Sequence, residues 1–129
     1  MKKKLVLILL VLSGAIGYSQ SLDCSKIKNG KFYNPEYPNK ITLRKDNIQE
    51  SYNDELLQLV WSVKWISECE FETVCTKSIG NVPIAVGDKI VTTITSIDGK
   101  CYTCKRTFYS KENPDGDVDP SSTFCIKTD

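Results

Sequence analysis

The chain has 129 residues, which is room for one domain, and its 17 basic side chains nearly balance its 16 acidic ones. Three of the basic residues belong to an expected leader, so 14 remain in the mature chain, where they are spread among the 16 acids. This pattern argues against nucleic acid as a partner, because phosphate binding needs a clustered basic face. The chain has no histidine, the commonest general base and metal ligand, and we expect that the protein is not an enzyme.

Residues 1–19 have the three regions of a secretory signal peptide. Lysines at positions 2–4 precede the apolar run 5–12, and small residues follow it. The apolar run is too short for a comfortable membrane span, so we expect cleavage after Ser19 or Gln20. The mature protein, residues 20–129, is then a single disulfide-rich β domain without a membrane span. We predict that it is secreted or periplasmic.

Short strands joined by turns are predicted along the first half of the mature chain. An Asn29-Gly30 turn precedes a strand at 31–33, and the segments 41–44 and 48–52 alternate apolar with polar residues. We expect Leu43 to pair with Ile48 and Ile41 to pair with Glu50. Glu50 is then the one charged residue on an otherwise apolar face of its strand.

The segment 57–75 predicts a hairpin that forms the core. Every second residue up to Trp65 is apolar, and the alternation resumes at Cys69. A two-residue loop would pair Trp65 with Glu70, which mixes the two faces. A three-residue loop at 66–68 pairs Trp65 with Cys69 and keeps the apolar residues together, so we predict that register.

The second half of the chain also predicts strands. The segment 88–97 is rich in β-branched residues, Asp98-Gly99 is the strongest hairpin turn signal in the chain, and 100–109 returns. A long acidic loop, 110–122, precedes a short closing strand at 123–127. Seven to eight strands connected in sequence predict an all-β, antiparallel up-and-down meander that closes into a small barrel or half-barrel.

Six cysteines in an exported domain of this size indicate three disulfides. They are Cys24, Cys69, Cys75, Cys101, Cys104 and Cys125. On extended strands Cys69 and Cys75 would be roughly 20 Å apart, and Cys101 and Cys104 roughly 10 Å apart, so neither pair can bond. Several connectivities stay open, and among them we expect Cys69 to bond Cys24 and Cys75 to bond a C-terminal cysteine.

The spacing of Cys101 and Cys104 also occurs in thiol redox enzymes and zinc knuckles. In redox enzymes the first cysteine lies at a helix N-terminus, whereas the flanking residues here predict a strand. A zinc site needs a second thiolate pair of suitable spacing, which Cys69 and Cys75 do not provide. We therefore favour structural disulfides over a redox or zinc role.

Cys24, the run Gly30-Lys31-Phe32 and the run 65–69 (WISEC) resemble small exported bacterial proteins of unassigned function. The opening Gly-x-Phe is also similar to that of lipocalin-like barrels. The resemblance implies a lipocalin-like barrel or half-barrel, stapled by disulfides, that could hold a small apolar or amphipathic ligand.

Two groups of residues are candidate sites. Trp61, Trp65 and Glu50 could line a ligand pocket, although aromatic residues in a small domain more often pack in the core and a lone carboxylate more often lies at a rim. Oxygen ligands at every second position of the acidic loop could bind calcium, although a solvated turn is the simpler interpretation; they are Asn113, Asp115, Asp117 and Asp119. We expect no other cofactor.

The sequence is therefore compatible with two functions. The first is a non-catalytic module that binds a small ligand inside the barrel. The second is a structural or cell-surface interaction protein whose barrel is filled by its own side chains, since a small eight-stranded barrel is only just wide enough for one ligand.

Overall fold

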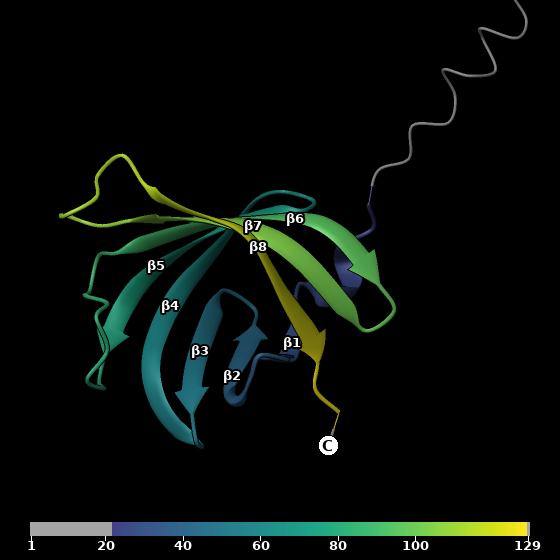
Figure 1. The fold of residues 1–129 in the computed structure, drawn as a ribbon, viewed down its shortest axis with the longest axis horizontal. Helices are drawn as coiled ribbons and strands as arrows, with labels where there is room; N and C mark the ends of the chain where they lie inside the picture. Colours follow the sequence, from purple (N-terminus) through teal and green to yellow (C-terminus); the bar gives the residue numbers. More distant parts are fainter. Residues whose placement is uncertain (1–21, 129) are drawn as a thin grey trace, which may run out of the picture.

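The computed structural model describes residues 22–128, and within them eight antiparallel strands close into a barrel (Figure 1). Each strand pairs with its neighbour in sequence, and the first pairs with the last. The strands are β1 (Gly30–Asn34), β2 (Tyr37–Lys45), β3 (Ile48–Asn53), β4 (Leu56–Ser67), β5 (Glu70–Ser78), β6 (Lys89–Asp98), β7 (Cys101–Tyr109) and β8 (Asp117–Ile126). The predicted all-β meander is confirmed, and it is a closed barrel. The expected leader 1–19 and its cleavage site lie outside the described residues.

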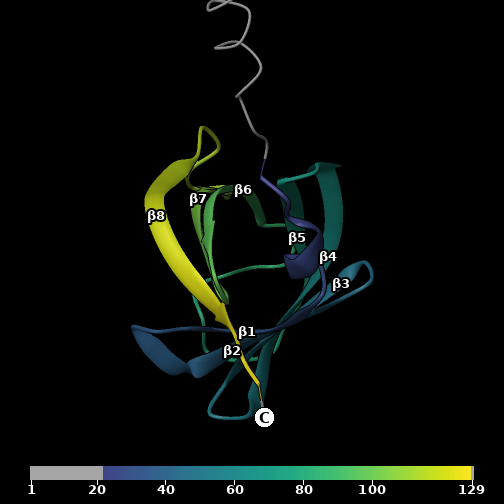
Figure 2. The same ribbon diagram turned by 90° about the vertical axis from the view of Figure 1, so that its right-hand side faces the viewer.

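A single turn of 3-10 helix, η1 (Ser25–Ile27), precedes the barrel. Figure 2 shows it on the side of β4 and β5, away from β8. Ile27 is buried and belongs to a core cluster with Phe32, Val63, Phe71 and Tyr102. The helical turn therefore helps to fill one end of the barrel, which we call the closed end. Within residues 22–128, no helix has the length and hydropathy that a membrane span requires.

The turn between β2 and β3 is tighter than the sequence suggested. Lys45 pairs with Ile48, which leaves a two-residue turn that begins at Asp46, whose φ is 58°. Aspartate tolerates this left-handed conformation better than most residues. The expected pairings of Leu43 with Ile48 and of Ile41 with Glu50 are therefore wrong by two residues: Leu43 lies opposite Glu50, and Ile41 lies opposite Tyr52.

The central hairpin, β4 and β5, has the expected faces but a different register. Ser67 pairs with Glu70 across a two-residue turn, and Trp65 pairs with Phe71. A bulge between Trp65 and Ser67 inserts one extra residue, which restores the alternation that a two-residue turn alone would break. The predicted pairing of Trp65 with Cys69 is therefore wrong, although the apolar residues still share one face.

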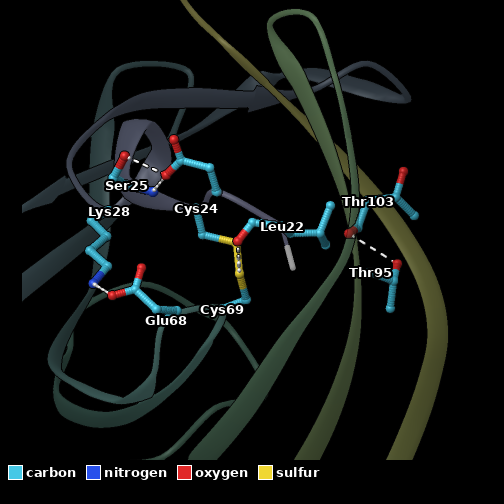
Figure 3. Close-up of a disulfide and its surroundings, with 9 residues drawn as sticks. Leu22, Cys24, Ser25, Lys28, Glu68, Cys69, Thr95 and Thr103 are labelled. Carbon is cyan, nitrogen blue, oxygen red and sulfur yellow. Dashed lines mark hydrogen bonds and ion pairs between the residues drawn. A yellow bond between two sulfur atoms is a disulfide. The ribbon is translucent and has the colours of Figure 1, made fainter. Parts of the chain in front are cut away.

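The expected disulfide between Cys24 and Cys69 is present, with a Cα–Cα distance of 5.5 Å. It joins the residue before η1 to the β4–β5 turn, and an ion pair between Lys28 and Glu68 (3.8 Å) lies beside it (Figure 3). The N-terminal segment is thus held to the closed end both covalently and by charge.

The prediction of three disulfides is wrong, because the structure contains two. Cys101 bonds Cys125, its direct partner across β7 and β8. Cys75 and Cys104 are free and buried. Cys75 packs in a cluster with Leu59, Trp61 and Ile90, whereas Cys104 packs in the closed-end cluster. Because the two thiols lie in different parts of the core, they do not bond each other.

We predict that thiol labelling finds two free thiols per chain, and only after denaturation. Both thiols are buried, and burial raises the pKa of Cys104 to about 11, so neither is expected to react in the folded protein. Labelling with a thiol reagent, with and without denaturant, measures the count. Cys75→Ala should lower it to one, and a count of zero in the denatured wild type would contradict this connectivity.

We also predict that replacing both Cys24 and Cys69 by alanine lowers the free energy of unfolding by about 4 kcal/mol. The two residues are 45 positions apart, so their bond restricts a large loop of the unfolded chain. Urea denaturation of the double variant and the wild type measures the difference. An unchanged unfolding midpoint would show that the bond does not stabilise the fold.

Candidate functional site

A cavity of about 460 Å³ lies inside the barrel, toward the end opposite η1. It reaches the β1–β2 turn, the end of β3 and the β5–β6 loop; Tyr37, Asn53 and Pro83 are among its lining residues. Its volume is in the range of small-molecule sites in proteins, roughly 300–1,000 Å³. The barrel is therefore not filled by its own side chains.

One wall of the cavity is apolar. It is built by Leu59 and Trp61 from β4, Ile90 from β6 and Phe108 from β7, and Ile84 of the β5–β6 loop packs against the same group. Ser78 Oγ donates a hydrogen bond to the carbonyl of Ile84 (2.8 Å), which holds the loop over the barrel. These side chains offer an apolar surface to a ligand.

The adjoining wall, formed by β2 and β3, carries most of the short polar side chains of the cavity. Thr42 on β2 and Gln49, Ser51 and Asn53 on β3 line it. Ser51 Oγ accepts a hydrogen bond from Trp61 Nε1 (3.1 Å), so the two walls meet at this pair. A molecule with one apolar and one polar side fits such a division better than a purely apolar one.

Arg44 lines the cavity where the cavity meets the closed-end core. It is 1% exposed, and its guanidinium donates to the carbonyls of Ile27 (2.6 Å) and Lys28 (2.9 Å) and to Gln49 Oε1 (3.0 Å). It also lies over the ring of Phe71, 4.6 Å from the centroid. Sequence alternation gives no sign of this role, since a charged residue at the polar positions of an alternating strand is expected to face solvent.

Arg106 on β7 is the second arginine of the cavity. Its Nη2 lies 2.9 Å from Asp119 Oδ2, and Asp119 also accepts a hydrogen bond from Ser122 Oγ. Burial acts to raise the pKa of Asp119, but the hydrogen bonds from Ser122 and Arg106 outweigh it and hold the pKa below its usual value. Asp119 is therefore charged at neutral pH and fixes the position of Arg106.

The predicted ligand residues are not brought together. Trp61 lines the cavity, whereas Trp65 packs against Phe71 with ring centroids 4.6 Å apart, in the closed-end core. Glu50 is not among the described residues that line the cavity; it accepts a hydrogen bond from the hydroxyl of Tyr52 (3.2 Å). Its neighbours on β3 face the cavity, so the strand alternation turns Glu50 to the outer face. The polar residues that do face inward were missed because we took the apolar face as the inner one.

The four candidate calcium ligands lie in the β7–β8 loop and in the first part of β8. Asn113 and Asp115 lie in the β7–β8 loop, Asp117 starts β8, and Asp119 is bound to Arg106. Among residues 22–128, no three histidine, cysteine, aspartate or glutamate side chains converge as a metal site.

A comparison of the chain with known protein families, curated proteins and solved structures found no match. The cavity is thus the feature from which a function is argued.

We predict that Arg44→Lys lowers the free energy of unfolding by about 3 kcal/mol. A lysine keeps the charge, but it lacks the planar guanidinium with which Arg44 reaches two carbonyls and an amide oxygen at once. A buried ammonium that lacks some of these hydrogen bonds raises the free energy of the folded state. Urea denaturation measures the loss. Lys45→Arg, on the exposed neighbouring position, is the matched control and should leave stability unchanged.

Proposed function

We propose that this protein is exported and binds a small apolar or amphipathic molecule inside its barrel, as lipocalin-like proteins do, without catalysing a reaction. The observation that carries the proposal is the cavity of about 460 Å³ between an apolar and a polar wall. The signal-like leader and the two disulfides support export, because disulfides persist in oxidising compartments.

The intrinsic fluorescence of Trp61 tests this proposal. A ligand in the cavity would contact the indole, so we expect titration with a panel of fatty acids, retinoids, haem and oligosaccharides to change the emission for at least one class. Trp61→Phe should abolish the change. Trp65→Phe is the matched control and should keep it, because Trp65 packs in the closed-end core.

No spectral response to any probe in this panel would contradict the proposal. In that case a cell-surface interaction protein is the better candidate, and one observation favours it. Several exposed apolar side chains lie at the cavity end of the barrel, in its turns and loops or beside them: Tyr37, Leu56, Ile79, Val86 and Val118. Groups of exposed apolar side chains are typical of contact surfaces.

A further inference from the structure

The lining of the cavity carries positive charge. Its charged side chains are Lys40, Arg44 and Arg106, and no aspartate or glutamate of the described residues lines it. Asp119, which pairs with Arg106, balances one of these three charges. The lining therefore keeps a net positive charge, which attracts an anion to the cavity.

The three cations differ in their availability to a ligand. Arg44 is buried and already donates to two carbonyls and to Gln49. Lys40 is exposed at the mouth, with its ammonium 5.1 Å from the ring centroid of Tyr37. Arg106 lies deeper, beside the apolar wall, and is the cation best placed for a ligand inside the cavity.

Arg106 is held in place before any ligand arrives. Its Nε (3.3 Å) and Nη2 (2.9 Å) both donate to Asp119 Oδ2, and its guanidinium lies 5.4 Å from the ring centroid of Phe108 and 5.2 Å from that of Phe124. Both rings line the cavity. Its Nη1 donates no hydrogen bond to any of residues 22–128. A fixed guanidinium with free donors loses little entropy when it binds an anion.

We infer, on the basis of the proposed function, that the ligand is an amphipathic anion whose carboxylate or equivalent head accepts hydrogen bonds from Arg106. The apolar body of the ligand lies against Trp61, Ile90 and Phe108. Ile90 is the strand partner of Phe108, and Phe108 is the next inward-facing residue after Arg106, so head and body sites are adjacent.

Three probes of equal chain length separate charge from apolar contact: decanoate, decanol and decylamine. Each is titrated into the full mature protein at neutral pH, with binding followed by Trp61 fluorescence and by calorimetry. We expect decanoate to bind about tenfold more tightly than decanol, since a charged hydrogen bond contributes more than a neutral one, and decylamine to bind most weakly.

Variants then assign the preference to Arg106. Arg106→Gln should weaken decanoate binding about tenfold and leave decanol binding unchanged. Lys105→Gln removes the same charge from the adjacent, exposed position of β7 and should change neither. If Arg106→Gln does not fold, the double variant with Asp119→Asn removes both partners of the ion pair and is measured in its place.

The outcomes distinguish this inference from the function on which it rests. Decanol or decylamine binding at least as tightly as decanoate, or an unchanged decanoate affinity in Arg106→Gln, would overturn the inference and leave the proposed function standing. The inference also falls if none of the three binds while another probe of the wider panel does. Failure of the whole panel removes the proposed function as well.

Discussion

The barrel depends on one buried guanidinium. Arg44 comes from β2, but its donors end on the carbonyls of Ile27 and Lys28 and on Gln49 of β3, so it joins the N-terminal segment to two strands. The rings of Phe32 and Phe71 lie 4.8 Å and 4.6 Å from it. Removing such a charge from water is costly, and the bonds to carbonyls at the end of η1, which lack helical partners, offset that cost.

This closure also explains where the cavity lies. At the closed end, η1, the Cys24–Cys69 bond and a cluster of aromatic rings fill the interior. Beyond Arg44 the inner positions of β2 and β3 are short polar side chains such as Thr42 and Ser51, which leave space between themselves and the larger apolar residues of β4 to β7. An eight-stranded barrel has little room to spare, so these small residues decide whether it holds a ligand.

Several features could be predicted from the sequence, and the reasons are local. The two-residue period of β4 and β5 predicted their shared apolar face, and the reach of an extended strand excluded a bond between Cys69 and Cys75. Registers were less accessible, because the bulge after Trp65 leaves no mark in the alternation. The inner face of β3 was assigned wrongly for a related reason: the apolar Ile48 lies outside the cavity lining, whereas the polar Gln49 and Ser51 belong to it.

The amino-acid sequence by itself determined the all-β meander, the turn at Gly99 and the exclusion of bonds between Cys69 and Cys75 and between Cys101 and Cys104, since these follow from strand period, turn chemistry and chain reach. Only the tertiary structure decided which thiols stay free, which face of β3 points inward and where the arginines lie. Each of these depends on which strands pair with one another and on which side chains then face the interior. A barrel brings together residues such as Arg106 and Asp119, 13 positions apart on neighbouring strands, and a periodic pattern carries no record of that contact.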